Sequence, residues 1–180
     1  MRSNALPHVF QKYRADIDDA LHASLIQNEM LLHHMIHYAM GWDGVDRKVR
    51  STTDGKALRP TLCLLTCEAN GGQVSAALPA AVSLELVHRF SLIHDDIQDR
   101  DETRHHRPTL WAVWGEPRSL IAGNTLKVIA DMAVWGLVTQ GLDFENALMA
   151  AGILTEAYLL MIEGQYLDIS YEGRPDISVQ

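Results

Sequence analysis

Three aspartates, Asp95, Asp96 and Asp99, close an apolar stretch of the chain that includes Leu92 and Ile93. Residues four apart share one face of a helix, so Asp95 and Asp99 would present two carboxylates together. Such charges are costly beside apolar side chains unless a cation joins them, and Mg²⁺ takes carboxylates together with water and substrate phosphates. The pattern predicts a magnesium site, although a solvated acidic helix end is the commoner explanation for aspartate clusters.

A basic cluster follows the aspartates within ten residues and consists of Arg100, Arg104, His105, His106 and Arg107. Arginine side chains bind phosphate oxygens through a planar fork of N–H donors. Carboxylates that hold a metal ion, beside cations that hold phosphate, are typical of a diphosphate site. This context distinguishes the cluster from an ordinary acidic surface.

Other polar residues could complete such a site. Lys56 and Arg59 lie three apart at an expected helix start, where the free N–H groups also attract anions. His88 lies seven residues before the first aspartate and so shares its helix face. Gln165 and Asp168 share a face of a later helix. Each of these features alone is more often an ordinary polar helix end.

Four motifs occur in a recognisable order: Gly-Lys-x-x-Arg-Pro, His-x6-Asp-Asp-x-x-Asp, Arg-x-x-Arg-Pro-Thr and Glu-Gly-Gln-x-x-Asp. Together they resemble the trans-isoprenyl diphosphate synthases, also called the polyprenyl synthetase family. The resemblance extends over nearly the whole chain, from about residue 13 to residue 179. It implies a prenyltransferase that condenses an allylic diphosphate with isopentenyl diphosphate.

On the allylic side, the resemblance implies that Asp95, Asp96 and Asp99 form the first aspartate-rich motif, with Asp95 and Asp99 as the direct Mg²⁺ ligands. Two or three Mg²⁺ ions are expected in a complete site. Arg104 matches the arginine that contacts the allylic diphosphate. Gln165 and Asp168 match a pair that lines this site from the facing helix; they are catalytic candidates together with the three aspartates and Arg104.

For isopentenyl diphosphate, the resemblance implies a pocket of Lys56, Arg59 and His88. His105 stands where the family usually has a second arginine on this side, and histidine cannot form a bidentate fork. Phe90 and Ser91 occupy the family's chain-length positions and resemble those of short-chain, farnesyl- or geranylgeranyl-type synthases.

Family members are roughly twice as long as this chain, and the motifs found here belong to their N-terminal half. The second aspartate-rich motif is missing from the sequence. We therefore expect a second polypeptide to supply these carboxylates in a hetero-oligomer. Three alternatives stay open: a class I terpene cyclase subunit, which would not use isopentenyl diphosphate; a non-catalytic regulatory subunit of a heteromeric synthase; and a truncated piece of a longer protein.

The elements that must position these residues are predicted to be helices, because most apolar residues recur every three or four positions. Five are expected, at about residues 7–40, 56–70, 75–99, 117–141 and 143–171, with a polar loop at 100–108. These would form a single all-α domain over residues 1–180, the N-terminal half of a helical bundle of the isoprenoid synthase type.

Composition narrows the class further. Of the 180 residues 47% are hydrophobic and 21% are charged, as in a globular domain, and the formal net charge of −8 argues against nucleic acid as a partner. The N-terminus lacks a signal-peptide pattern, and the breaks in the longest uncharged run predict no membrane span. The expected location is cytoplasmic.

Overall fold

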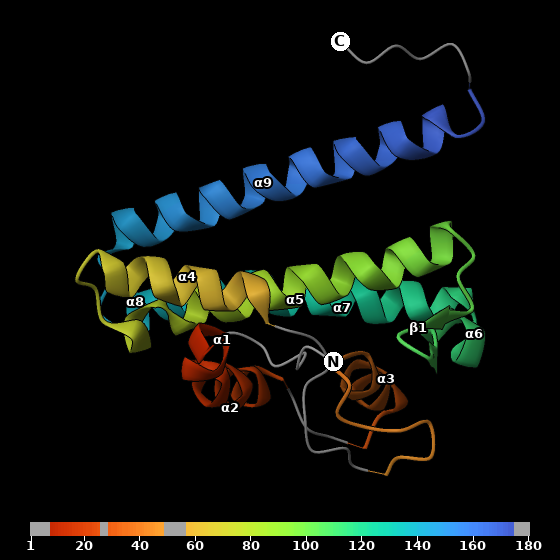
Figure 1. Ribbon diagram of the computed structural model, residues 1–180, viewed down its shortest axis with the longest axis horizontal. Helices are drawn as coiled ribbons and strands as arrows, with labels where there is room; N and C mark the ends of the chain where they lie inside the picture. The colour runs from red at the N-terminus through yellow and green to blue at the C-terminus, as the bar shows by residue number, and fades with distance from the viewer. Residues whose placement is uncertain (1–7, 26–28, 49–56, 175–180) are drawn as a thin grey trace, which may run out of the picture.

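The computed structural model describes residues 8–25, 29–48 and 57–174. Lys56, which the sequence placed in the isopentenyl pocket, lies outside these residues. The elements are α1 (His8–Lys12), α2 (Arg14–Ser24), α3 (Leu31–Ala39), α4 (Leu58–Ala69), α5 (Val74–Gln98), β1 (Thr103–Arg104), β2 (Arg107–Pro108), α6 (Leu110–Trp114), α7 (Glu116–Val134), α8 (Gly136–Thr139) and α9 (Phe144–Tyr171). The fold is an all-α bundle (Figure 1).

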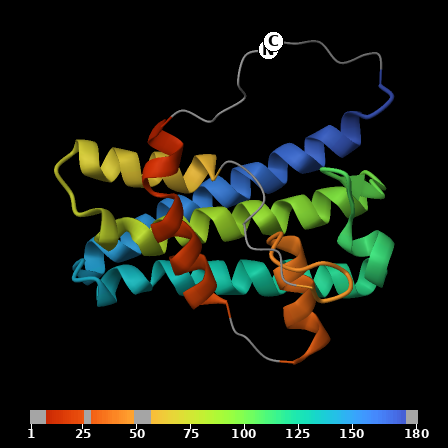
Figure 2. The same ribbon diagram turned by 60° about the horizontal axis from the view of Figure 1, so that its bottom comes forward.

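The single helix predicted over residues 7–40 is wrong, because α1, α2 and α3 replace it. The chain is extended at Leu25, which is buried, and again at Met30, where α3 begins. Leu25 and Leu32 are seven residues apart, so the apolar stripe continues in phase and gives no sign of the break. Most of α3 is buried, and it lies beside α7 rather than in line with α2 (Figure 2).

The central helix is α5, which packs most extensively against α7 and α4 and also contacts α2. Its apolar side chains are buried on several faces, among them Leu86 and Phe90. The buried Ser83 hydroxyl donates a hydrogen bond of 2.8 Å to the Ala130 carbonyl in α7. Close approach of the two helices is possible at Gly123, where a Cβ atom would lie 2.6 Å from the His94 ring. The helix is thus held firmly along its length.

The segment predicted as a polar loop at 100–108 contains a short antiparallel hairpin. Thr103 of β1 pairs with Pro108 of β2, and Arg104 pairs with Arg107. The two residues of the turn, His105 and His106, have positive φ angles of 51° and 63°. Two-residue hairpin turns with both φ positive match the twist of the strands, but they are usually built from Asn and Gly. Local sequence therefore did not reveal this turn.

The last helix, α9, lies along one side of the bundle and contacts it through one stripe only (Figure 1). Ala147 is its only fully buried residue among those described. By length and composition alone, three segments are apolar enough to cross a membrane: Val74–Gln98, Glu116–Thr139 and Phe144–Tyr171. In the most apolar windows of the first two, 44% and 33% of the residues are buried in the bundle, but only 6% are buried in α9.

Candidate diphosphate site

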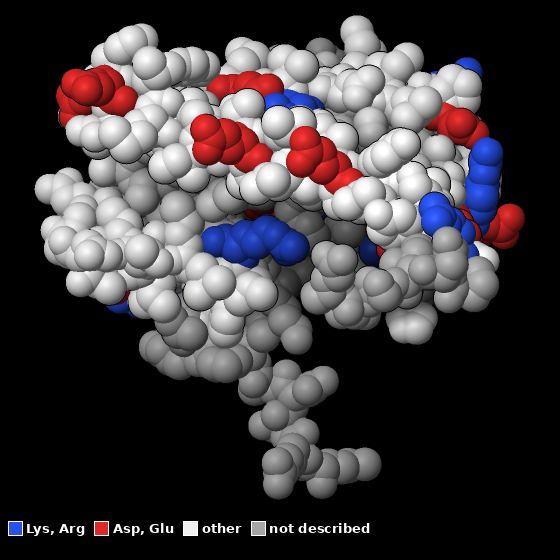
Figure 3. All heavy atoms as spheres, turned by 90° about the horizontal axis from the view of Figure 1, so that it is seen from above, with Lys and Arg blue, Asp and Glu red and all other residues white. Residues whose placement is uncertain are grey.

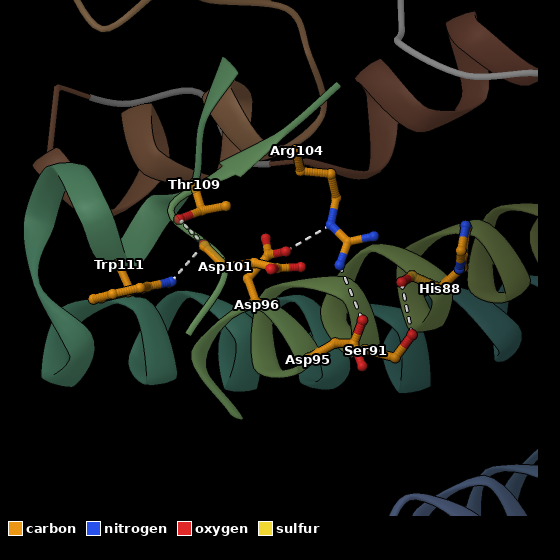
Figure 4. Close-up of polar contacts among 8 residues, drawn as sticks. All are labelled: His88, Ser91, Asp95, Asp96, Asp101, Arg104, Thr109 and Trp111. Atoms are coloured by element: carbon orange, nitrogen blue, oxygen red, sulfur yellow. Dashed lines mark hydrogen bonds and ion pairs between the residues drawn. The ribbon is translucent and has the colours of Figure 1, made fainter. Parts of the chain in front are cut away.

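The acidic end of the site is at the last turns of α5, where Asp95 and Asp96 both bind Arg104 of β1. The Arg104 Nη2 atom donates to Asp95 Oδ2 at 2.9 Å, and its Nε donates to Asp96 Oδ1 at 2.6 Å (Figure 4). Burial raises the pKa of Asp96, and the hydrogen bond from Arg104 opposes that rise. One guanidinium thus holds two adjacent carboxylates in fixed orientations.

The turn after α5 is anchored by the carbonyl of Asp101. It accepts hydrogen bonds of 2.8 Å from the Thr109 hydroxyl and from the indole N–H of Trp111 (Figure 4). These bonds connect the start of α6 to the loop that leads into β1. The hairpin therefore returns Arg104 toward the end of α5, which explains how a residue eight or nine positions downstream reaches both aspartates.

Asp99, one turn beyond Asp95, faces a different opening. A cleft of about 590 Å³ lies between the ends of α5 and α9, and its lining includes Asp99, Arg100, Asp168 and Glu172. Asp99 is exposed, but desolvation raises its pKa, and the negative charges of Asp95, Asp101, Asp168 and Glu172 raise it further. The structure thus brings the predicted Asp168 close enough to Asp99 for the two carboxylates to repel each other.

The donor set fits the kind of site that Mg²⁺ uses. Within residues 8–25, 29–48 and 57–174, no three His, Cys, Asp or Glu side chains are grouped closely enough to hold a metal ion by themselves. Mg²⁺ commonly takes only one or two carboxylates and fills its other positions with water and substrate phosphates. Asp95 and Asp99, one turn apart, could supply two such carboxylates.

A second pocket of about 510 Å³ lies between α5 and α9 beside Asp95; we call it the large pocket, in contrast to a cavity of about 70 Å³ described below. Its polar lining includes Arg59, His88, Gln98 and Gln165. Its apolar lining includes the following side chains: Phe90, Tyr158, Met161, Ile162, Tyr166 and Ile169. The structure therefore brings half of the predicted site residues to one pocket, whose lining combines cationic and amide groups with aromatic and aliphatic groups.

His88 is neutral at physiological pH. Burial, together with the positive charges of Arg59, Arg89 and Arg104, lowers its pKa to about 4. A neutral imidazole keeps an acceptor nitrogen and one N–H donor, so it can bind a phosphate oxygen as a donor without adding charge. The positive charge of this part of the pocket comes from the arginines.

The chain-length candidates, Phe90 and Ser91, line the same pocket. Phe90 is buried, and its ring packs edge-on against His94 and Tyr158, with centroid distances of 4.5 Å and 5.5 Å. The Ser91 hydroxyl turns back and donates to the carbonyl of His88 at 2.9 Å (Figure 4). Aromatic rings from α5 and α9 therefore form one wall of the pocket.

His105 does not join Arg59 and His88 in the large pocket. It lines a smaller cavity of about 70 Å³ with Arg89, Asp96 and Arg104 on the other side of the aspartates. The hairpin turns its loop away, so its assignment to the isopentenyl side has no support from this arrangement. Its substrate-binding role stays a prediction.

Sequence reasoning missed two residues that the structure places here. Arg89 lines the small cavity and pairs with the buried Glu85 at 3.0 Å; the i,i+4 spacing inside an apolar helix was an available signal. Tyr158 closes the apolar part of the large pocket, and nothing in the local pattern of α9 distinguished it from a core residue.

Comparison with known proteins agrees with this geometry. A family model described as polyprenyl synthetase matches residues 47–180. The (2E,6E)-farnesyl diphosphate synthase of Mycobacterium tuberculosis is 38% identical over 147 residues, which are 81% of this chain and 39% of that protein. The geranylgeranyl diphosphate synthase of the same organism is 34% identical over 171 residues, which are 95% of this chain and 48% of that protein.

Among solved structures, the polyprenyl synthetase of Streptomyces coelicolor superposes with a TM-score of 0.85 at 34% identity. The match includes 95% of this chain and 49% of that one. The chain belongs to the polyprenyl synthetase family and has its all-α fold. It spans about two-fifths to one-half of the length of these relatives.

Proposed function

We propose that this chain forms the allylic-diphosphate half of a Mg²⁺-dependent prenyltransferase that makes a short-chain prenyl diphosphate. The observation that carries the proposal is the pocket between α5 and α9, whose lining includes Asp95 and combines cationic with apolar side chains. A prenyl diphosphate has the same two parts, an anionic head and an apolar tail. The relatives named as farnesyl and geranylgeranyl diphosphate synthases support the same substrate class.

In this proposal Arg59 and Arg104 bind diphosphate oxygens, and neutral His88 donates one hydrogen bond. Mg²⁺, when bound to Asp95 and Asp99, would supply Lewis-acid stabilisation of the leaving diphosphate. The apolar lining would hold the hydrocarbon tail and exclude water from the electrophilic carbon formed when the diphosphate leaves. Phe90 and Tyr158 limit the space available to the product.

A second polypeptide would complete the site with further carboxylates. One observation supports this: within the described residues, α9 leaves most of its apolar surface uncovered. Exposed apolar surface of this extent is unusual on a stable monomer and typical of an interface.

The proposal can be tested by reconstitution. The 180-residue chain would be mixed with the unmatched C-terminal part of the Streptomyces coelicolor polyprenyl synthetase, radiolabelled isopentenyl diphosphate, geranyl diphosphate and Mg²⁺. We expect labelled farnesyl or geranylgeranyl diphosphate, and Asp95→Ala should lower the rate at least about 100-fold, as loss of one stabilising group does elsewhere.

Three outcomes would overturn all or part of the proposal. No elongation in a stable complex would argue against the enzyme. A hydrocarbon formed from geranyl diphosphate alone, without label, would favour the cyclase alternative. Elongation that is unchanged by Asp95→Ala would favour a regulatory role for this chain.

A further inference from the structure

A buried ion pair inside α5 has no part in the function proposed above. The Arg89 Nε atom donates to Glu85 Oε1 at 3.0 Å, and the Arg89 and Glu85 side chains are only 11% and 4% exposed. Burial raises the pKa of Glu85, and the positive charge of Arg89 opposes that rise. Apolar side chains of similar size often replace a buried ion pair without loss of stability, so packing alone does not explain this one. A buried ion pair beside a cavity is a candidate for a functional role.

Arg89 lines the small cavity of about 70 Å³, which is bounded by α3, α5 and the β1–β2 hairpin. The residues that α5 contributes to this cavity are spaced three or four apart on one face of the helix: Arg89, Leu92, Ile93 and Asp96. The large pocket uses a different face of α5, through His88, Ser91 and Asp95. Leu92 lines both cavities, so the two are neighbours at this point of the helix.

The small cavity concentrates positive charge. Three arginines line it, Arg89, Arg104 and Arg107, and among the described residues its lining has one carboxylate, that of Asp96. The concentration is local, because the chain has a formal net charge of −8 and the side seen in Figure 3 shows acidic side chains set separately into a mostly uncharged surface. Like charges close together repel, and guanidinium groups bind phosphate oxygens through paired N–H donors. The small cavity therefore suits a phosphoryl group.

This cavity suits a diphosphate that is not held through Mg²⁺. Asp95 and Asp99, the proposed Mg²⁺ ligands, line the large pocket and the cleft at the end of α5 instead, and Asp96 accepts a hydrogen bond of 2.6 Å from Arg104. The volume of the small cavity admits a phosphoryl group in place of a few water molecules, but not a prenyl chain. The proposed condensation requires a second diphosphate, and Leu92 offers its short hydrocarbon an apolar path to the large pocket.

We infer that Arg89 binds the diphosphate of the isopentenyl substrate in the small cavity, and that Glu85 is the positioning residue that orients the Arg89 guanidinium. His105 lines the same cavity but cannot form a bidentate fork, which Arg89 supplies. Because Glu85 accepts from Nε at a spacing of four residues, the helix itself fixes the plane of the group. The charge of the cavity indicates a diphosphate; its assignment to the isopentenyl substrate rests on the proposed function.

The kinetic test uses the reconstituted complex and the double variant E85Q/R89Q. Changing both residues avoids leaving a buried carboxylate without its cation and keeps hydrogen-bonding groups of similar size. We expect the KM for isopentenyl diphosphate to rise at least about tenfold, as loss of a charge-assisted hydrogen bond predicts. The KM for geranyl diphosphate should change less than about twofold. R118Q, which removes the charge of an exposed arginine on α7, should change neither constant.

Two further variants separate binding from a structural effect. R89K keeps the charge but not the fork, so its KM for isopentenyl diphosphate should lie between those of the wild type and E85Q/R89Q. E85Q/R89Q/H105R returns a guanidinium to the lining of the small cavity from the hairpin, so it should lower this KM again. Circular dichroism confirms that each variant keeps its helical content. A purely structural role for the pair would raise both KM values together, and H105R would restore neither.

Binding of inorganic diphosphate in EDTA tests the small cavity without catalysis and without Mg²⁺. Isothermal titration calorimetry of the 180-residue chain would use an R59Q background, which removes the arginine that lines the large pocket. We expect R59Q to bind diphosphate, R59Q/R118Q to bind it equally well, and R59Q/E85Q/R89Q to bind it at least about tenfold more weakly.

The inference is overturned if E85Q/R89Q leaves the KM for isopentenyl diphosphate unchanged in an active complex, or if it raises both KM values equally. It is also overturned if diphosphate binding in EDTA is the same with and without Arg89. An unchanged KM in a complex that elongates would leave the proposed function standing. Failure of the wild-type complex to elongate, with Arg89-dependent binding in EDTA, would overturn the proposed function and the isopentenyl assignment while supporting the anion site.

Discussion

The helices α5 and α9 are alike in sequence character and opposite in environment. They contain 25 and 28 residues, and their most apolar windows have mean hydropathies of 1.3 and 1.4. Yet 44% of that window is buried in α5 and only 6% in α9. Apolar character predicts that a helix will be covered, but which residues cover it depends on the other elements present.

The difference extends to the site. Asp95 and Asp96 on α5 are held by Arg104, and the turn that carries Arg104 is anchored at Asp101. On α9 the main ties near the pocket are the Tyr158 ring against Phe90 and the Lys127 ammonium, which lies 4.6 Å from the centre of the Tyr158 ring. One wall of the pocket is therefore firmly supported, and the other makes few contacts with the rest of the described structure.

The largest expected effect comes from matched leucine truncations on the two helices. Leu86 in α5 is fully buried, so Leu86→Ala should lower the free energy of unfolding by about 2–5 kcal/mol. Leu160 in α9 is mostly exposed, so Leu160→Ala should change it by less than about 0.5 kcal/mol. Urea unfolding followed by circular dichroism measures both. Equal losses would mean that α9 is covered in the isolated chain.

Glycine substitutions should differ in sign between the two regions. At Gly123, between α7 and α5, a Cβ atom would lie 2.6 Å from the His94 ring, so Gly123→Ala should destabilise the fold by about 1–3 kcal/mol. At Gly152 in α9 a Cβ atom meets nothing within 4 Å, so Gly152→Ala should stabilise it by up to about 1 kcal/mol. Thermal unfolding of the two variants checks the prediction, and a stable Gly123→Ala protein would contradict the close helix contact.

Low pH should destabilise the fold through a histidine on α5, because α9 contains no histidine. Folded His88 has a pKa of about 4, whereas the unfolded residue titrates near its ordinary value of about 6.5. Between these two pH values the unfolded state binds more protons than the folded state. The free energy of unfolding should therefore decrease as the pH falls from about 6.5 to about 4. The dependence should be shallower in His88→Asn, measured by urea unfolding at several pH values. An unchanged pH dependence in this variant would mean that groups other than His88 cause the loss of stability at low pH.

The sequence by itself determined the helical class, most of α4, α5 and α9, and the grouping of Asp95 with Asp99. These follow from local rules: the 3.6-residue period, and the return of a helix to the same face after four residues. The family motifs assigned Arg59 and His88 to the isopentenyl side and Gln165 to the allylic side, and the structure places all three in the lining of one pocket.

Only the tertiary structure decided the rest. The break between α2 and α3 leaves no sign in the sequence, because the apolar stripe stays in phase across it. The β1–β2 turn uses His105 and His106 at positive φ, which local preference disfavours, and its direction separates His105 from the large pocket. The Tyr158 ring packs against Phe90, which is 68 positions away in the sequence. The exposure of α9 depends on which other elements pack against it. Such features depend on contacts between distant segments, which no local pattern records.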